Sequence, residues 1–315
     1  MIHVIVFSYN RALQVDTLLS SFFEHWKSPS VHVDVLYNTS SLQFEKGYDI
    51  LKDKYNAKDV SFVRESLDVV DKVKLVDFLN IYNLVRLYRF PKLRHPKSNF
   101  RSLLIELMEN TKSDSVMFLT DDSMFINDIE VREADLDWIN AAPENRQFSL
   151  RLGKGENDLP SSVSDNSVYC NWNMYENIHS WGYPFSVDSH IYNKEYILRL
   201  FRKYLFINPN TLEANICGVV KRKRKLGLGR CFSNIKMLTF PINIVQDCVD
   251  NICQDVSVEI LNQKLLEGCC MRYEVPAKFD ATKQYVESLI FTDASGKITK
   301  MQIDSNPNSR PNSKQ

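Results

Sequence analysis

Residues 116–123 read VMFLTDDS, an apolar run that ends abruptly in two adjacent carboxylates. Four consecutive apolar residues predict a strand that is buried on both faces, in the middle of a mostly parallel sheet. Acidic side chains at the carboxyl end of such a strand face the crevice where open α/β sheets bind ligands. Asp121 and Asp122 are therefore candidates for holding Mg²⁺ or a similar cation against phosphate oxygens. The alternative is a solvated turn at the strand end.

The segments before this strand alternate between strand and helix patterns. Residues 2–7 and 31–37 predict strands, residues 48–55 a short helix and residues 60–64 a third strand. Between the first two strands, apolar residues recur at spacings of three and four from Ala12 to Trp26, which predicts a helix. This order predicts right-handed βαβ units of a parallel sheet. We therefore expect ligands to gather beyond Phe7, Tyr37 and Leu119.

Composition limits the class of protein. The chain has 315 residues, 44% of them hydrophobic, and 39 basic against 39 acidic residues, so it can bury a large core and is not expected to bind nucleic acid. The amino terminus has no basic region before its apolar run, and no apolar run reaches about 18 residues, so neither a signal peptide nor a membrane span is predicted. Seven cysteines, an odd number, favour reduced thiols and a cytoplasmic location.

Two common phosphate-binding motifs are missing from the sequence. No G-x-G-x-x-G follows the first strand, and G-x-x-x-x-G-K-[ST] does not occur. If phosphates are bound, we expect a metal to hold them.

The turn after the first strand and the Thr-Asp-Asp segment carry a family resemblance. IVFSYNRAL at residues 5–13, the polar end of the second strand and the hydrophobic-Thr-Asp-Asp sequence resemble the nucleotide-sugar half of GT-A-fold glycosyltransferases, especially glycosyltransferase family 2. The resemblance covers residues 3–125 well and is looser afterwards. It implies that Asp122 binds Mn²⁺ or Mg²⁺ and that Asp121 contacts ribose or sugar, although the sequence departs from a strict D-x-D. It also implies a donor-binding turn made of Ser8, Tyr9, Asn10 and Arg11.

The second half of the predicted domain offers candidates for acceptor binding. Residues 146–152 predict a strand, and Arg151 near its end is a further candidate for donor binding. The segment at 169–184 mixes aromatic rings with Asn, Glu and His, as a sugar site requires. Trp172 and Trp181, together with His190 in a predicted strand at 185–192, are the acceptor candidates. Packing in the core is an equal alternative for the tryptophans.

The looser part of the resemblance implies a general base near the start of a later helix. Residues 208–213 read NPNTLE, a turn entering a helix that Asn210 or Thr211 could cap. Glu213 is the first candidate for the base that takes a proton from the acceptor hydroxyl, and Asp188 is the second. Compensation of the helix dipole is the structural alternative for Glu213.

Two basic segments stand out in an otherwise balanced chain. Residues 221–225 read KRKRK, which could contact a diphosphate or an anionic membrane carrying a lipid-linked acceptor, or remain a solvated loop. Residues 68–88 are rich in apolar residues at helical spacing. The basic, proline-broken segment 86–97 that follows predicts a surface loop.

The sequence thus predicts an α/β protein with a GT-A-like, mostly parallel sheet flanked by helices. Residues 1–245 form the domain, with a nucleotide-sugar half at 1–125 and an acceptor half at 126–245. A helical extension follows at 246–300 and a disordered tail at 301–315. The predicted function is metal-assisted, inverting transfer of a sugar from a UDP- or GDP-sugar to a glycan or lipid-linked hydroxyl. The alternatives are a sugar nucleotidyltransferase and a catalytically silent carbohydrate-binding protein.

Overall fold

The computed structural model describes residues 1–28, 30–154, 160–177, 179–243, 254, 256–275 and 286–303. The helices, with three short 3₁₀ helices labelled η, are α1 (Ala12–His25), α2 (Leu42–Lys54), α3 (Leu75–Phe78), α4 (Ile81–Arg89), η1 (Pro91–Arg94), α5 (Phe100–Asn110), α6 (Glu133–Asn140), η2 (Met174–Glu176), η3 (His179–Gly182), α7 (Lys194–Lys203), α8 (Pro209–Arg222) and α9 (Val258–Leu266). The strands are β1 (Ile2–Tyr9), β2 (Val31–Asn38), β3 (Val60–Arg64), β4 (Ser115–Thr120), β5 (Ser123–Phe125), β6 (Arg146–Ser149), β7 (Ser164–Asp165), β8 (Tyr169–Asn173), β9 (His190–Asn193), β10 (Leu228–Phe232), β11 (Met237–Thr239), β12 (Cys270–Tyr273), β13 (Ser288–Thr292) and β14 (Ile298–Gln302).

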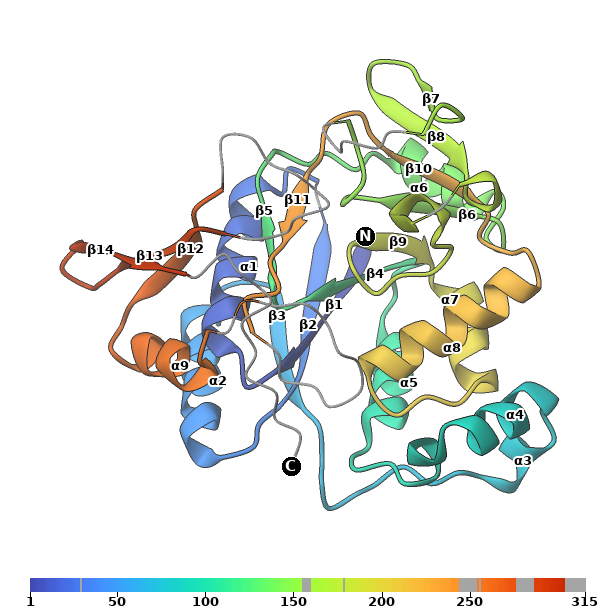
Figure 1. Ribbon diagram of the computed structural model, residues 1–315, viewed down its shortest axis with the longest axis horizontal. Coiled ribbons are helices and arrows are strands. Elements are labelled where there is room, and N and C mark those ends of the chain that lie inside the picture. The colour runs from blue at the N-terminus through green and yellow to red at the C-terminus, as the bar shows by residue number, and fades with distance from the viewer. Residues whose placement is uncertain are drawn as a thin grey trace.

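A nine-stranded mixed sheet runs through the molecule in the order β3-β2-β1-β4-β9-β6-β10-β8-β7 (Figure 1). The strands β3, β2, β1 and β4 are all parallel, which confirms the predicted βαβ order. β9 lies antiparallel between β4 and β6, and β8 lies antiparallel to β10. The fold is therefore the expected α/β class, with a sheet whose strands mostly point the same way.

Alternate side chains of the central strands enter two separate cores. Val4 and Val6 of β1 pack in one cluster with α1, α2 and α9, whereas Ile5 and Phe7 pack in the other with α5, α7 and α8. Figure 1 shows these two groups of helices on opposite sides of the central strands. The strands β1 and β4 carry apolar side chains on both faces because both faces are covered.

Helix α8 begins at Pro209, at least two residues earlier than the expected caps imply. Asn208 is the N-cap, its side chain accepts a hydrogen bond from the Thr211 N–H at 2.9 Å, and Pro209 occupies the first turn. The caps predicted at Asn210 or Thr211 are therefore wrong, because the fixed φ of proline suits the first helical position and leaves the capping role to the residue before it. The last turn of α8 reaches Arg222, so the basic run at 221–225 is partly helical.

The segment after residue 250 is not simply helical. Helix α9 is present as predicted, with Ser257 as its N-cap, but β12, β13 and β14 form an additional three-stranded antiparallel sheet. Met301 and Gln302, expected in a disordered tail, belong to β14, where they pair with Leu289 and Ser288. Residues 304–315 of that predicted tail lie outside the described residues.

The basic segment at 86–97 is also more regular than the predicted loop, because it contains the end of α4 and the 3₁₀ helix η1. Among the residues that the structure describes, no helix has the length and apolar character needed to cross a bilayer.

Candidate functional site

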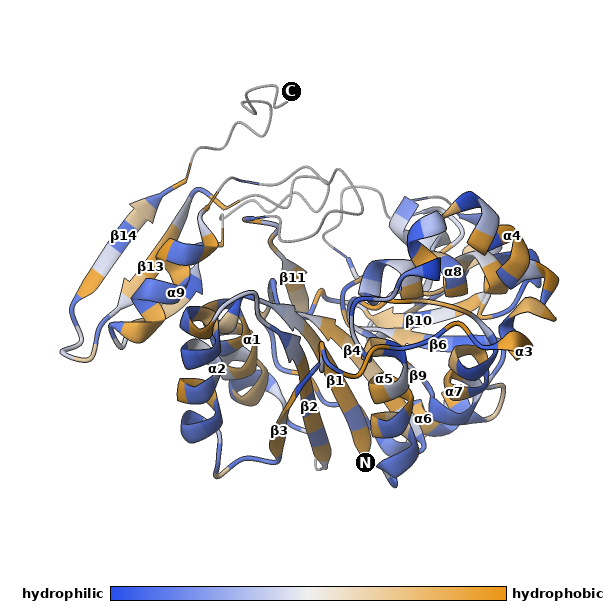
Figure 2. Ribbon diagram, turned by 90° about the horizontal axis from the view of Figure 1, so that it is seen from below, coloured by the Kyte–Doolittle hydropathy of each residue, from blue (hydrophilic) through white to orange (hydrophobic). Residues whose placement is uncertain are grey.

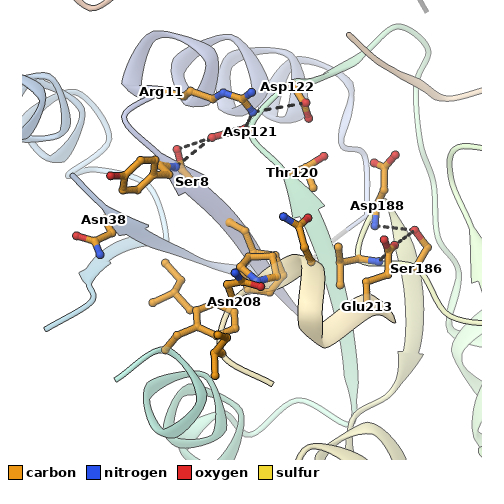
Figure 3. Close-up of a pocket in the computed structure, with 18 of the residues that line it drawn as sticks. Ser8, Arg11, Asn38, Thr120, Asp121, Asp122, Ser186, Asp188, Asn208 and Glu213 are labelled. Atoms are coloured by element: carbon orange, nitrogen blue, oxygen red, sulfur yellow. Dashed lines mark hydrogen bonds and ion pairs between the residues drawn. The ribbon is translucent and has the colours of Figure 1, made fainter. Parts of the chain in front are cut away.

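A cavity of about 1550 Å³ opens at the carboxyl ends of β1, β2 and β4. It is also lined by the turn before β9 and by the start of α8, so segments from both halves of the predicted domain contribute to it. This position agrees with the general rule for ligands in open α/β sheets. Figure 3 shows Arg11, Asp121 and Asp122 on one side of this pocket and Asp188, Ser186 and Glu213 on the other.

Asp121 is held by the end of β1. Its Oδ2 accepts hydrogen bonds from the Ser8 hydroxyl at 2.8 Å and from the Tyr9 N–H at 3.3 Å. Ser8 in turn is 2.6 Å from the hydroxyl of Tyr48, a fully buried residue of α2. These contacts fix the carboxylate of Asp121, the residue that directly follows the apolar strand β4.

Arg11 brings a positive charge to the same point. Its Nη1 lies 2.8 Å from Asp121 Oδ1 and 3.6 Å from Asp122 Oδ2, and its Nη2 donates to the carbonyl of Asn243 at 2.6 Å. Burial alone lowers the pKa of Arg11, but the two carboxylates outweigh it and raise that pKa. This side of the pocket therefore contains a permanent cation in contact with two acids.

Asp122 retains an unsatisfied oxygen. Its Oδ1 is buried and has no hydrogen-bond partner among the described residues. Burial, opposed by Arg11 and reinforced by Asp121 and Asp188, raises the pKa of Asp122 to about 6. A buried carboxylate oxygen without a donor is costly unless a proton or a cation occupies it.

The other residues of the predicted donor turn differ in how they face the pocket. Tyr9 lines the cavity and is 37% exposed. Asn10 has a left-handed backbone, with φ of 58°, and its side chain bonds Ser40 twice, once to the hydroxyl at 2.9 Å and once to the N–H at 2.8 Å. Asn10 thus ties the end of β1 to the end of β2 and is absent from the residues that line the cavity.

Asp188 and Arg151 meet on the opposite side. Arg151 Nη1 donates to Asp188 Oδ2 at 2.9 Å, and the Thr239 hydroxyl donates to the same oxygen at 3.0 Å. The strand predicted at 185–192 begins only at His190, because Ser189 has a left-handed φ of 62° that breaks the extended chain. This turn points Asp188 into the pocket. Because its charge is already shared with Arg151, Asp188 is better suited to positioning than to removing a proton.

Glu213 has a different environment. It lies in the second turn of α8, and its Oε1 accepts hydrogen bonds from the Ser186 hydroxyl at 2.9 Å and from the Val187 N–H at 3.0 Å. No ion pair involving Glu213 occurs among the described residues. Burial raises the pKa of Glu213 despite these two donors. The structure therefore provides a buried carboxylate that is held in place by uncharged groups.

His190 is buried at the edge of the pocket. Its Nδ1 lies 2.8 Å from the carbonyl of Asp188, which can only accept, so the proton sits on Nδ1. Burial lowers the pKa of His190 to about 4, so the ring is neutral near pH 7. Its Nε2, which remains an acceptor, is buried and has no partner among the described residues.

The two tryptophans expected at the acceptor site lie elsewhere. Trp172 and Trp181 are both buried and pack edge to face at 4.8 Å in a small core of their own, where Trp172 Nε1 donates to the Trp181 carbonyl at 2.9 Å. The indole of Trp172 lies directly over Gly229, where a side chain would collide with it. Neither tryptophan lines the cavity. The tryptophans of this segment therefore belong to a packing cluster, together with Cys170 of β8 and Cys231 of β10.

Several lining residues were not singled out from the sequence. Glu65 follows β3 directly, and its Oε2 accepts from the Ser98 hydroxyl at 2.5 Å. Lys92, His95 and Lys97 also line the cavity, from the segment that was expected to be a solvated loop. The signal for Glu65 was available, since polar residues after every parallel strand collect at one edge of the sheet.

A second group of possible metal ligands lies away from this pocket. His3, His32 and Asp34 come together at the amino ends of β1 and β2, with His3 Nε2 2.7 Å from Asp34 Oδ2. These residues are at the opposite ends of their strands from Tyr9 and Asn38. They do not contribute to the cavity.

Comparisons with known proteins give one similar sequence and several partial structural alignments. No family model matches the chain. "Bifunctional glycosyltransferase pgtA" from Dictyostelium discoideum is 26% identical over 306 residues, which cover 84% of this chain and 35% of pgtA. The chain thus spans about a third of the length of that relative. The similarity to a named glycosyltransferase agrees with the resemblance derived from the sequence.

Among solved structures, S. aureus TarS 1–349 in complex with UDP aligns with a TM-score of 0.44 at 12% identity, covering 84% of this chain and 69% of that chain. The mannosyltransferase PcManGT from Pyrobaculum calidifontis, in complex with GDP-Man and Mn²⁺, aligns with a TM-score of 0.37 at 14% identity, covering 63% of this chain and 46% of that chain.

Proposed function

We propose that this chain is a glycosyltransferase that moves a sugar from a nucleotide-diphosphate donor to a hydroxyl acceptor. The observation that carries the proposal is the arrangement of one pocket. Arg11, Asp121 and Asp122 form one side of it, and Glu213, held by uncharged donors, lies on the other side. The similarity to pgtA, which is named a glycosyltransferase, supports the same reaction class.

The donor binds, in this proposal, against the ends of β1, β2 and β4. The Arg11 guanidinium suits a diphosphate because its planar fork matches phosphate oxygens. Asp121 is rigidly held by Ser8 and the Tyr9 N–H, so it can orient a ribose or sugar hydroxyl. Ser8, Tyr9 and Arg151 line the same cavity and complete the predicted donor contacts.

A divalent cation fits this side of the pocket. The donor set is a carboxylate with a buried, unpartnered oxygen, and Mg²⁺ commonly uses one or two carboxylates together with phosphate oxygens. Asp122 would hold the ion, and the ion would neutralise charge that develops on the departing diphosphate. Arg11 already supplies one positive charge at this point, so the cation adds to an existing electrostatic contribution.

Glu213 is the proposed general base. A sugar hydroxyl attacks efficiently only while its proton is being removed, and a carboxylate with a raised pKa is a stronger base than an ordinary one. With a donor on the Asp122 side, an acceptor held at Glu213 would approach from the other side of the sugar, so we propose inversion at the anomeric carbon. Asp188 holds Arg151 in place for its contact with the donor, and the unpartnered Nε2 of His190 can accept a hydrogen bond from an acceptor hydroxyl.

The acceptor class in this proposal is a glycan or a lipid-linked sugar. The expected compartment is the cytoplasm, on cysteine usage alone.

A donor panel tests the proposal. The protein is incubated with UDP-, GDP- and CMP-sugars in the presence of Mn²⁺, Mg²⁺ or a chelator, and release of the nucleotide is measured. We expect slow hydrolysis of one donor, loss of most of this activity in Asp122→Asn or with chelator, and retention of donor binding in Glu213→Gln. Glu195→Gln, a change at an exposed glutamate of α7, is the matched control.

Two outcomes would favour other functions. Binding of a sugar nucleotide without hydrolysis, unaffected by Asp122→Asn, would favour a silent carbohydrate-binding module in which Arg11 alone balances the acids. Formation of a sugar nucleotide from a sugar phosphate and a nucleoside triphosphate would favour the nucleotidyltransferase.

A further inference from the structure

The segment at residues 72–97, here called the α3–α4 corner, carries an unusual concentration of exposed apolar side chains. It contains α3, α4 and η1, which lie together at one corner of the molecule, away from the central strands (Figure 1). Figure 2 shows apolar colouring on both α3 and α4 at that end. The exposed apolar residues of the corner are Leu75, Val76, Phe78, Leu79, Ile81, Leu84, Val85, Tyr88 and Phe90.

Helix α4 presents this surface as a regular stripe. Ile81, Leu84, Val85 and Tyr88 recur at i, i+3, i+4 and i+7, the spacing that normally faces a core, yet Ile81 is 75% and Tyr88 81% exposed. The opposite face of the helix is the one that packs against the domain: Leu87 is buried in a small cluster with Leu93 and Leu205. Leu84 and Val85, between them, are 43% and 42% exposed, so the stripe faces outward although its pattern is that of a buried face.

Polar contacts also fix the packed side of α4, which carries Leu87, to the domain. The side chain of Asn83 donates to the Lys203 carbonyl at 3.2 Å and accepts from the Leu205 N–H at 3.2 Å. The Tyr82 hydroxyl donates to the Asn215 carbonyl at 3.0 Å. Because these contacts anchor the helix, the stripe cannot turn inward without breaking them.

Charge on the corner is almost entirely positive. Residues 72–97 contain seven Lys and Arg residues and a single acid, Asp77. Asp77 is buried and pairs with Arg101, so it adds no surface charge. Among the described ion pairs, none involves a basic residue of the corner. The cations are Lys72, Lys74, Arg86, Arg89, Lys92, Arg94 and Lys97.

The combination of an exposed apolar stripe with positive charge decides between two possible partners, a second copy of the chain and a lipid bilayer. A symmetric contact with a second copy would place these like charges against one another, which is unfavourable. An anionic bilayer offers both an apolar interior for the stripe and negative headgroups for the cations. We propose that the α3–α4 corner binds the surface of an anionic lipid bilayer, with Ile81, Leu84, Val85 and Tyr88 inserted among the lipids.

The corner is continuous with the mouth of the pocket. Pro91, Lys92, His95 and Lys97 belong to the corner and also line the cavity. A bilayer at the corner therefore lies beside the pocket entrance, where an acceptor carried by a lipid could reach it. This last consequence rests on the proposed function, whereas binding to the bilayer does not.

Vesicle sedimentation with the 315-residue chain tests the proposal. Vesicles of phosphatidylcholine are compared with vesicles that also contain phosphatidylserine. We expect binding to the anionic vesicles only, weakened by added salt. The triple change Ile81→Gln, Leu84→Gln and Tyr88→Gln should lower the partition coefficient at least about tenfold. It removes apolar groups whose burial among the lipids contributes to the free energy of binding. Lys72→Gln, Lys74→Gln and Arg89→Gln should each lower it roughly fivefold.

The matched control changes an exposed apolar and an exposed basic residue of α2, at the other end of the molecule: Leu42→Gln with Lys46→Gln. We expect no change in binding for this variant. Circular dichroism and donor hydrolysis report whether each variant is folded, independently of the lipid result.

Three results would overturn the proposal: equal binding to both kinds of vesicle, no binding to either, or equal weakening by the control variant. A dimer in sedimentation velocity that the stripe variant abolishes would assign the corner to a second copy instead. None of these results would affect the donor assay of the proposed function.

Discussion

The two sides of the pocket are built on different electrostatic principles. On the donor side, Arg11 lies between Asp121 and Asp122, and charges of opposite sign are in contact. The carboxylate of Glu213 instead accepts hydrogen bonds from two uncharged groups, the Ser186 hydroxyl and the Val187 N–H, while the nearby charges of Asp188 and Arg151 are paired with each other. A group that neutralises phosphate must stay charged at all times, whereas a base must be able to gain and lose a proton. In the proposed function, the comparison therefore separates a donor-binding side from a proton-accepting side, and the changes below test that separation.

The largest expected effect comes from Glu213→Gln. The amide keeps the shape of the side chain but cannot take a proton, so we expect kcat for transfer to fall by about 10²–10⁴-fold. Donor binding should be nearly unchanged, because Glu213 lies on the other side. Transfer kinetics with a competent acceptor, together with donor titration, measure the two effects. A large loss of donor affinity would show that the sides are not separate.

The next effect concerns stability on the donor side. The raised pKa of Asp122 means that the folded protein binds this proton more tightly than the unfolded chain does. Stability from this group is present below the unfolded pKa and is lost as pH rises through about 6. Asp122→Asn should therefore stabilise the protein at pH 7 by roughly 1–3 kcal/mol, with little gain near pH 4.

Denaturant melts at the two pH values measure this difference. Mn²⁺ should raise the Tm of the unmodified protein and not that of Asp122→Asn. An equal rise in both proteins would place the ion elsewhere, and the group of His3, His32 and Asp34 would then be examined.

A smaller effect is expected in the pH dependence of the reaction. Because burial raises the pKa of Glu213, the acid limb of the kcat/KM profile should have its midpoint above the ordinary glutamate value of about 4.3. Activity increases as pH rises through that midpoint, because the base must be ionised. The limb should disappear from the residual activity of Glu213→Gln. A limb that persists in this variant with its midpoint near 6 would assign the titration to Asp122.

The smallest effect on activity is expected from Trp172→Phe. This change removes the hydrogen bond to the Trp181 carbonyl and leaves a space over Gly229, so we expect a loss of about 1–2 kcal/mol in the free energy of unfolding. The acceptor KM should not change, since Trp172 does not line the cavity. A selective rise in that KM would restore the acceptor role expected from the sequence.

The parallel part of the sheet could be predicted because its physics is local. The runs in β1 and β4 are mostly apolar, β2 and β3 alternate apolar with polar residues, and each strand is followed by polar residues, so both the strands and the edge where ligands gather follow from the sequence. Asp121 and Asp122 were found by this reasoning. The prediction of Asp188 and Glu213 depended on the looser family resemblance. The structure brings both residues into the same cavity as Asp121 and Asp122.

Other features depend on partners that are distant in the chain. The pairing of β5 with β11 joins residues 123–125 to residues 237–239, and neither segment is long enough to give a clear pattern. The role of Trp172 is decided by Gly229, which a count of aromatic residues cannot reveal. In α4, the apolar spacing correctly predicted a helix, but it did not predict that the apolar stripe would face outward.

The C-terminal sheet has a consequence for how short this protein can be made. Thr17, in α1, donates to the Met271 carbonyl of β12 at 3.0 Å, and Met271, Tyr273 and Leu289 pack in the same apolar cluster as α1. Arg11 immediately precedes that helix. A chain truncated after residue 243 would uncover the flank of α1 and loosen the segment that places the guanidinium. Residues beyond the expected domain boundary at 245 are thus structural support for the pocket, and fragments intended for assay should retain them.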